Sequence, residues 1–341
     1  MNILITGGAG FIGTNLCHYL INSTSHNIHV IDSLTYAGNI ISLDGISDNK
    51  RFKFSHVDII EKEKIKDIFK KFMPDAVMHL AAESHVDRSI HSYNDFIKTN
   101  ILGTVNLLEI SYAYWESLEL HKKNEFKFHH ISTDEVYGSL GKDGYFKETT
   151  PYDPSSPYSA SKASSDHFVR VWNRTYGLPT IITNCSNNYG PYQNKEKLIP
   201  MIISNALHGK EITIYGDGSN IRDWLYVDDH VEALYTVLLN SDSGKTYNIG
   251  GNYEMTNNQV VQKICELLEL SISADDRSHK FIDLIKYTSD RKGHDKRYAI
   301  DSTLLKKELE WQPRETFDTG IKKTIEWYLN NMDWVNKTSK N

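Results

Sequence analysis

The sequence predicts an α/β protein, built on a doubly wound parallel sheet with a smaller mixed α/β lobe after it. Three observations predict this class. Short runs rich in Ile, Val and Phe alternate with longer segments of helical spacing through the first half of the chain. The first of these runs leads into a glycine-rich turn that opens a helix. After about residue 185 the elements become shorter, and turn-rich stretches separate them.

The alternation of strand and helix predicts a mostly parallel sheet with helices on both faces. The expected strands are Asn2–Thr6, Ile28–Asp32, Phe52–Asp58, Ala76–Leu80, Phe126–Ser132 and Pro179–Asn184. The expected helices of the same half are Gly10–Ser23, Glu61–Phe72, Asp95–Leu118 and Tyr158–Tyr176.

The second half of the chain predicts a lobe that closes over this sheet. Helical spacing returns there at Thr256–Leu268, Ser302–Leu309 and Thr316–Leu329. No linker rich in Pro, Gly or Ser separates the halves, so we expect them to share one interface and one cleft. We therefore expect a first domain at residues 1–185, a second lobe at 186–335 from which some chain returns to the first, and a polar tail at 336–341.

Composition narrows the class of protein. The chain has 341 residues, of which 39% are hydrophobic and 24% charged, an ordinary globular balance. Its net charge of -6 disfavours a nucleic-acid partner, because phosphate binding favours a basic surface. Three widely spaced cysteines without a CxxC pair predict neither a disulfide framework nor a metal site. Without a signal sequence or an uncharged span of about 20 residues, the expected location is the cytoplasm, away from membranes.

The glycine-rich turn predicts a dinucleotide cofactor. The run GGAGFIG connects the first expected strand to the first helix, and it includes Phe11 and Ile12. In this pattern Gly7 permits a tight turn, Gly10 lets a pyrophosphate approach the backbone, and Gly13 lets helix and strand pack closely. The turn therefore indicates that the sheet is of the Rossmann type.

The ends of the next two strands indicate which dinucleotide binds. Asp32 would accept hydrogen bonds from both ribose hydroxyls, and its charge would repel a 2′-phosphate, so NAD is favoured over NADP. Asp58 ends the third expected strand and is a candidate adenine contact, with Ile59 as its apolar companion.

A tyrosine and a lysine stand one helical turn apart in the sequence YSASK. Tyr158 and Lys162 therefore project from the same helix face. Free tyrosine has a pKa of about 10. A tyrosine that acts as a base near neutral pH needs a pKa about 3 units lower, which corresponds to roughly 4 kcal/mol of preferential stabilisation of the phenolate. A nearby ammonium and a positively charged nicotinamide would provide it. Lys162 would also hold the nicotinamide ribose, and Thr133 would bond the same substrate hydroxyl as Tyr158.

Two adjacent carboxyls indicate more than simple oxidation. Asp134 and Glu135 directly follow Thr133, at the carboxyl end of a strand, where α/β sheets bind their ligands. Hydride transfer needs a base for the alcohol proton only, whereas loss of water from a ketose needs a base and an acid. Adjacent carboxyls divide these tasks if one stays protonated while the other ionises. The pair therefore predicts an oxidation followed by an elimination.

These motifs resemble the extended short-chain dehydrogenase/reductases, and among them the 4,6-dehydratases of dTDP-glucose. The STDEVYG stretch is specific, because epimerases of this fold usually lack the Asp-Glu pair and GDP-mannose dehydratases carry the Glu without this Asp. The matching segments are Thr6–Gly13, Asp32–Asn39, His79–Ile90, Ser132–Gly138, Tyr158–His167, Asn184–Tyr192, Tyr215–His230 and Asp290–Asp301.

The resemblance implies roles for the catalytic residues. It implies that Tyr158 deprotonates the C4 hydroxyl of a hexose while a hydride passes to NAD. It further implies that Glu135 removes the C5 proton, that Asp134 protonates the departing 6-hydroxyl, and that the hydride returns to C6. NAD would then be tightly bound and regenerated in each turnover.

The resemblance also implies binding residues and a partner. Ala81 would contact the cofactor, and Asn100 would be either a structural residue or a residue of the cofactor loop. The substrate contacts it implies are Ser84, His85, Arg88, Asn187, Lys197, Arg222, Arg291 and His294, with Glu83–Arg88 as a loop beside the sugar and nicotinamide. A homodimer through Asp95–Leu118 and Tyr158–Tyr176 is implied as well.

Alternatives remain open at this stage. Asn194-Lys195 and Lys292 depart from the family pattern at the nucleotide end, which leaves UDP- or CDP-glucose as possible substrates. A sugar-nucleotide 4-epimerase needs neither Asp134 nor Glu135, and a non-catalytic NAD-binding protein needs no Tyr158. Both are therefore disfavoured by the sequence.

Overall fold

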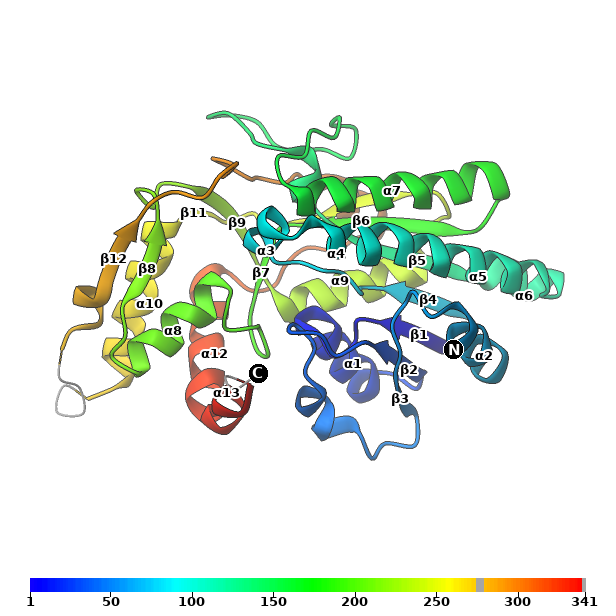
Figure 1. Cartoon of the computed structure of the whole chain (residues 1–341), viewed down its shortest axis with the longest axis horizontal. Coiled ribbons are helices and arrows are strands. Elements are labelled where there is room, and N and C mark those ends of the chain that lie inside the picture. The colour runs from blue at the N-terminus through cyan, green and yellow to red at the C-terminus, as the bar shows by residue number, and fades with distance from the viewer. Residues whose placement is uncertain (274–278, 339–341) are drawn as a thin grey trace.

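A computed structural model describes residues 1–273 and 279–338 of the chain. Its centre is a seven-stranded sheet in the order β10-β6-β5-β4-β1-β2-β3, and every neighbouring pair in it is parallel (Figure 1). Apart from the added β10, this is the strand order of the dinucleotide-binding Rossmann fold, which confirms the predicted class. The strands of this sheet are β1 (Asn2–Thr6), β2 (Asn27–Asp32), β3 (Phe52–His56), β4 (Ala76–His79), β5 (Lys127–Thr133), β6 (Thr180–Cys185) and β10 (Thr246–Ile249).

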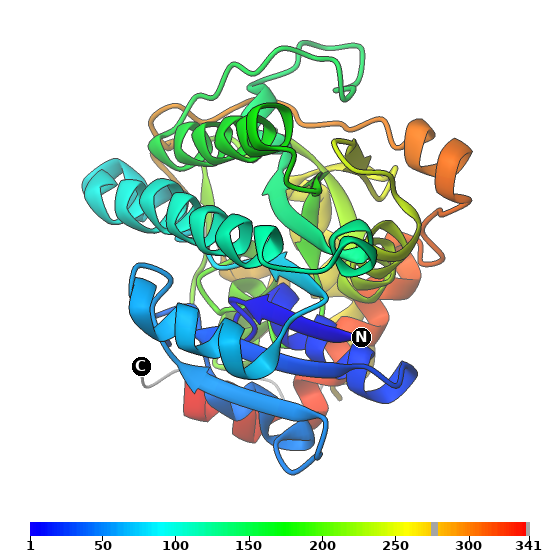
Figure 2. The same cartoon turned by 90° about the vertical axis from the view of Figure 1, so that its right-hand side faces the viewer.

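Helices cover both faces of the sheet because its strands are apolar on both sides. Ile3 and Ile5 of β1 pack with one group of helices, whereas Leu4 between them packs with the other. Figure 2 shows α7 and α5 lying together in the second group. The first group consists of α1 (Phe11–Ser23) and α9 (Val227–Asn240), and the second of α2 (Lys62–Phe72), α5 (Thr104–Glu116) and α7 (Pro157–Tyr176).

The smaller lobe has its own core and mixed strand pairing. Its three-stranded sheet has the order β11-β9-β7, with one antiparallel and one parallel pair, and β8 pairs with β12 in parallel. Its strands are β7 (Asn187–Tyr189), β8 (Ile212–Tyr215), β9 (Ile221–Tyr226), β11 (Glu254–Thr256) and β12 (Ile285–Thr288). Its helices are α8 (Leu198–Leu207), α10 (Asn257–Ser271), η5 (Phe281–Leu284), α12 (Phe317–Asn330) and α13 (Met332–Thr338).

The chain returns from the second half to the main sheet. Strand β10 pairs with β6, and α9 packs against α1 on the first face. Helix α11 (Thr303–Leu309) adds Leu305 to the same core. The larger lobe therefore includes segments far beyond residue 185.

The long helix expected at Asp95–Leu118 is interrupted. It begins as α4 (Tyr93–Phe96), widens into the π-helical segment η2 (Ile97–Gly103) and continues as α5. The Thr104 hydroxyl donates to the Asn100 carbonyl inside this stretch. Such local widening is frequent at functional sites.

Several other bounds differ from the expectation. Strand β3 ends at His56, so Asp58 lies in the following turn instead of at a strand end. Residues 336–338 of the expected tail are helical, within α13, and residues 339–341 lie outside the described part. The short elements not yet named are η1 (Ile40–Ile46), α3 (Val86–His91), α6 (Leu120–Glu125) and η3 (Asp134–Tyr137).

Two general features complete the fold. Cys17, Cys185 and Cys265 are buried as free thiols. Within residues 1–273 and 279–338, no helix is long and apolar enough to cross a bilayer.

Candidate active site

One cleft lies at the carboxyl ends of β1, β4, β5 and β6, where a doubly wound sheet places its ligands. The cleft gathers the residues predicted for the cofactor and for catalysis, together with three of the predicted substrate contacts. Those that line it are Gly7, Gly10, Phe11, Ile12, Gly13, Asp32, Asp58, Ile59, Ala81, Ser84, Thr133, Asp134, Glu135, Tyr158, Lys162, Asn187 and Lys197.

The glycine turn has the geometry that its sequence predicts. Gly7 has a φ of +74°, and a Cβ on it would stand 2.6 Å from the Ala81 nitrogen. A Cβ on Gly13 would overlap the Gly7 carbonyl oxygen. Helix α1 begins after Gly10 without a side-chain cap and without an acidic residue in its first turn. Its first N–H groups therefore face the cleft as an anion-binding site.

Asp32 is held at the end of β2 by the loops beside it. Its carboxylate accepts hydrogen bonds from the Ala9 nitrogen at 2.9 Å and the Leu34 nitrogen at 2.8 Å. Burial raises its pKa, against these two bonds and the charge of His56. Gly38 packs directly on it, since a Cβ there would stand 2.7 Å from Asp32 Oδ1. The second candidate, Asp58, accepts from the Ile60 nitrogen at 3.1 Å.

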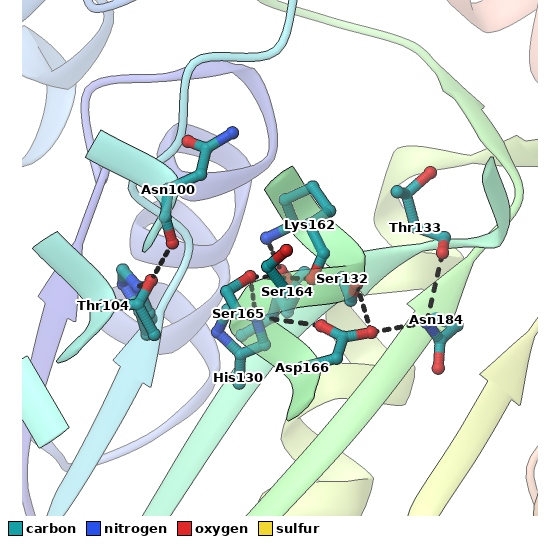
Figure 3. A network of polar contacts seen from close by, with 12 residues as sticks. Asn100, Thr104, His130, Ser132, Thr133, Lys162, Ser164, Ser165, Asp166 and Asn184 are labelled. Atoms are coloured by element: carbon teal, nitrogen blue, oxygen red, sulfur yellow. Dashed lines mark hydrogen bonds and ion pairs between the residues drawn. The ribbon is translucent and has the colours of Figure 1, made fainter. Parts of the chain in front are cut away.

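The tyrosine and lysine project from α7 into the cleft as expected. Tyr158 is 8% exposed and Lys162 4% exposed. Lys162 Nζ donates to the carbonyl of Ile131 on β5 at 2.8 Å (Figure 3). Thr133, two residues further along β5, contributes a side-chain hydrogen bond that lowers the pKa of Tyr158.

The protonation of Tyr158 differs from the expected picture. Burial raises the pKa of Tyr158 well above its usual value, and the charges of Glu135, Cys185 and Asp134 add to the effect. Lys162 is not among the largest influences on this pKa. The chain's own groups thus favour the neutral phenol, and a base role requires further positive charge in the cleft.

The two adjacent carboxyls lie in unlike environments. They begin the short helix η3, where the Glu135 nitrogen donates to the Thr133 hydroxyl at 3.3 Å. Burial, Glu135 and Asp223 raise the pKa of Asp134 well above its usual value, and Arg222 opposes them. Burial also raises the pKa of Glu135, but three cations oppose it, namely Lys197, Arg222 and Arg291. The pKa of Asp134 is therefore raised further than that of Glu135, which makes Asp134 the candidate acid and Glu135 the candidate base.

The cations around Glu135 come from the smaller lobe and its connections. Lys197 is half-buried, and its Nζ donates to the Ser84 carbonyl at 2.9 Å. Arg222 stacks on Tyr298 at 4.2 Å and donates to the Asp295 carbonyl at 3.0 Å.

The remaining predicted substrate residues do not line the cleft itself. Arg291 pairs with Asp87 at 2.6 Å, and His294 contacts Asp290 at 2.6 Å. Arg88 pairs with Glu196 at 2.6 Å, and His85 lies 3.5 Å from the same carboxylate. The contacts of Asp87, Arg88 and His85 connect the loop at residues 83–88 to segments 194–197 and 290–294.

Asn100 has a supporting role in the structure. Its amide exchanges two hydrogen bonds with the backbone of Glu83, at 2.8 and 3.0 Å, and donates to the Ser161 hydroxyl at 2.8 Å. It therefore ties the loop beside the cleft to α7.

The sequence assigned no binding role to several residues that line the cleft. Gln193 and Asn194 come from a turn between the lobes, and the Asn194 amide donates to the Tyr36 carbonyl at 3.1 Å. Gln193 Oε1 is buried without a hydrogen-bond partner, as are Asn187 Oδ1 and Asp134 Oδ2. Unpaired buried acceptors facing one cleft are typical of a site that binds a polar ligand. The one signal in the sequence for Gln193 and Asn194 is that they follow the end of β6, on the side where such a sheet binds its ligands.

The chain matches known proteins over nearly its whole length. The GDP-mannose 4,6 dehydratase family matches residues 4–324. The dTDP-glucose 4,6-dehydratase of Salmonella typhimurium is 56% identical over 345 residues, covering 98% of this chain and 95% of the relative. This chain belongs to the dTDP-glucose 4,6-dehydratases.

Other members of the family agree. The enzyme of that name from Neisseria meningitidis is 56% identical and covers 97% of this chain and 94% of its own. The Bacillus anthracis dTDP-glucose 4,6-dehydratase, solved in complex with NAD, has a TM-score of 0.85 at 44% identity and covers 99% of both chains. The Streptomyces venezuelae enzyme, solved with NAD and TYD bound, has a TM-score of 0.88 at 39% identity and covers 98% of both.

Proposed function

We infer that this chain catalyses the NAD-dependent 4,6-dehydration of dTDP-glucose, giving dTDP-4-keto-6-deoxyglucose and water. The observation that carries this inference is the Asp134-Glu135 pair in the cleft, in which burial raises the pKa of Asp134 well above its usual value and three cations oppose the same effect on Glu135. An epimerase has no need of such a pair. The identity of 56% to dTDP-glucose 4,6-dehydratases supports the substrate.

The residues of the first cleft wall fit NAD. The Gly7–Gly13 turn leaves the start of α1 open to a pyrophosphate, and Asp32 places a carboxylate where a ribose would lie. Asp58 and Ile59 would hold the adenine, and Ala81 the nicotinamide side. When bound, NAD supplies a hydride acceptor for C4, a hydride donor for C6, and a positive charge in its oxidised ring.

We propose that Tyr158 accepts the C4 hydroxyl proton during oxidation. Thr133 shares a hydrogen bond with Tyr158 and would bond the same substrate hydroxyl. Lys162, buried one turn away, would hold the nicotinamide ribose and contribute charge that favours the phenolate.

The elimination is assigned to the two carboxyls. A ketone at C4 makes the C5 proton acidic, and Glu135 takes that proton as an ionised base. Asp134, whose pKa is raised mainly by burial, gives its proton to the departing 6-hydroxyl, which leaves as water. The enone then accepts hydride at C6 and a proton at C5, so the cofactor ends in its starting form.

The smaller lobe is proposed to bind the nucleotide. Arg222 and Arg291 provide planar guanidinium groups that suit a diphosphate. The other proposed contacts to the sugar nucleotide are Ser84, His85, Arg88, Asn187, Lys197 and His294.

We also propose that two copies associate through α5 and α7. These helices lie side by side, and apolar side chains are exposed along them: Leu102 (54%) in η2, which leads into α5, and Val171 (43%) and Tyr176 (46%) in α7. Isolated apolar residues are common on surfaces, but a row on two adjacent helices fits a second copy. Val171→Glu should convert a dimer to a monomer in light scattering, whereas Leu270→Glu, at a distant exposed site, should not. A monomeric parent protein would contradict this proposal.

The reaction is tested with dTDP-glucose, UDP-glucose and CDP-glucose, following product mass and NADH absorbance. Loss of one water from dTDP-glucose, with no lasting NADH, is the expected result. Loss of water from UDP- or CDP-glucose alone would keep the reaction and change the substrate. An unchanged mass with a galactose product would contradict the dehydration.

A further inference from the structure

Asp166 is a fully buried carboxylate that the proposed reaction does not use. It stands on α7 one turn after Lys162 and two turns after Tyr158, and its side chain has 0% exposure. Its Oδ2 accepts hydrogen bonds from Ser132 Oγ at 2.9 Å and from Tyr152 OH at 2.8 Å. A carboxylate this deep costs several kcal/mol unless it is paired, so its presence needs a reason.

Asp166 and Lys162 contact the same strand at neighbouring residues. Lys162 Nζ donates to the carbonyl of Ile131, and the next residue, Ser132, donates its hydroxyl to Asp166 (Figure 3). Two successive turns of α7 are thereby attached to two successive residues of β5. The following residue of that strand is Thr133, which lies beside Tyr158.

A second connection holds the end of this strand. Asn184 of β6 donates its amide to the Thr133 carbonyl at 3.1 Å and lies 3.4 Å from Asp166 Oδ2. Asp166 thus contacts residues on both strands that carry the catalytic turn. A change at Asp166 would reach Thr133 and Lys162 without contact to any reacting atom.

Most titratable groups around Asp166 are neutral. His130 Nε2 lies 3.2 Å from Asp166 Oδ1, and burial lowers the pKa of His130 to about 4. The ring of His79, on β4, lies 5.1 Å from that of His130 at a tilt, and burial lowers the pKa of His79 too. Burial raises the pKa of Cys185, on β6, to about 12, and it raises the pKa of Tyr152 as well.

Two cations face this group. Arg170, a turn further along α7, donates to the Tyr152 hydroxyl at 2.7 Å and stacks on its ring at 4.7 Å. Lys162 is the cation on the cleft side. Burial lowers the pKa of Lys162, and the charge of Asp166 is the first of the groups that oppose this effect. Although burial also opposes ionisation of Asp166, hydrogen bonds from His130 and Ser132 and the charge of Lys162 lower its pKa.

We propose that Asp166 is a positioning residue that keeps Lys162 charged and fixes the end of β5, so that Tyr158 functions as a base at neutral pH. This inference rests on the proposed role of Tyr158. It explains why α7 contains the buried Asp166 carboxylate, although burial of a charge lowers the stability of the protein.

The first test is the pH profile of Asp166→Asn, with Tyr152→Phe as its matched control. Tyr152→Phe removes a hydrogen bond to the same oxygen but leaves the charge. Asp166→Asn should lower kcat about ten-fold at neutral pH and shift the acid limb of the profile to higher pH, because a less charged Lys162 raises the pKa of Tyr158. Tyr152→Phe should leave the limb in place. An equal loss at every pH, or the same shift in both variants, would overturn the proposal.

The second test needs no turnover, so it separates this inference from the proposed reaction. Urea unfolding midpoints are compared for Lys162→Met, Asp166→Asn and the double variant. Asp166→Asn should cost less stability in the Lys162→Met background than in the parent, because the paired charge is already gone. Additive costs would contradict the pairing. If Asp166→Asn alone does not fold, a soluble double variant supports the proposal and an insoluble one overturns it.

Discussion

The turn after β1 and the turn after β5 both lie at carboxyl ends of parallel strands, yet they are built by different means. After β1, backbone geometry decides: Gly7 and Gly13 stand where any Cβ would meet the backbone. After β5, nearby charges set the properties of the turn. The pKa values of Asp134 and Glu135 differ because more cations from the other lobe lie near Glu135 than near Asp134. The first turn depends on its own sequence, and the second depends on residues far along the chain.

The largest expected effect is at the second turn. Glu135→Gln should lower kcat by about 10² to 10⁴-fold, the range typical of a lost general base. Because oxidation at C4 does not need Glu135, NADH absorbance should rise and persist with dTDP-glucose. Glu148→Gln is the matched control, since burial raises the pKa of Glu148 too but it lies outside the cleft. A variant that turns over normally would remove Glu135 from the mechanism.

A change at the first turn should mainly reduce the amount of NAD that the protein binds. Gly13→Val places a side chain against the Gly7 carbonyl, so the start of α1 must move and bound NAD should be lost. Overpacking of this kind costs about 1–3 kcal/mol or more. NAD released on denaturation is the measurement. Gly141→Val, where nothing lies within 4 Å, should retain the parent's NAD content. Full NAD in Gly13→Val would show that the turn tolerates a side chain.

The pH dependence of stability should reveal a buried carboxyl of the second lobe. Burial raises the pKa of Asp223 from 3.8 to about 6, although backbone N–H groups of Tyr253 and Gly251 bond it. A raised folded pKa gives stability that is complete below about pH 4 and is lost as the pH rises through about 6. The loss is roughly 3 kcal/mol. Urea unfolding measured between these pH values should show a smaller loss of unfolding free energy in Asp223→Asn than in the parent. An equal dependence of unfolding free energy on pH in the two proteins would contradict this.

The smallest expected effect is a change in KM when the ion pair between Arg291 and Asp87 is broken. Arg291→Gln removes the partner of Asp87 and one of the cations near Glu135. The KM for dTDP-glucose should rise about ten-fold, equivalent to about 1.4 kcal/mol. Arg314→Gln breaks an exposed pair with Glu232 and should leave KM unchanged. An unchanged KM in Arg291→Gln would place the nucleotide elsewhere.

The sequence allowed the main sheet and its cofactor turn to be predicted because their signals are local. Strand β1 and helix α7 were located to within a residue from apolar runs and spacing. Strand β10 was missed, because its four residues carry no sign of the strand with which they pair, and Ile249 lies 64 residues after its partner Cys185. The interruption at η2 was also missed, and Asn100 within it bonds Glu83 and Ser161, which lie far away in the sequence.

The candidate site was predicted in part for the same reason. Residues within one motif, such as Thr133, Asp134 and Glu135, came together as expected in the cleft. The pKa of Tyr158 did not follow, because it reflects burial more than the lysine one turn away. Glu196 was not predicted either, although it holds both His85 and Arg88. Long-range pairs of this kind leave no trace in local spacing.

The return of β10 to the main sheet has a consequence for synthesis of the protein. Until residue 249 has left the ribosome, β6 is an unpaired edge and the apolar side of α1 has no α9 to cover it. The cofactor-binding domain therefore cannot complete its fold as soon as residues 1–185 have emerged. Its completion waits for the chain that also builds the nucleotide lobe, so the two walls of the cleft are finished almost together.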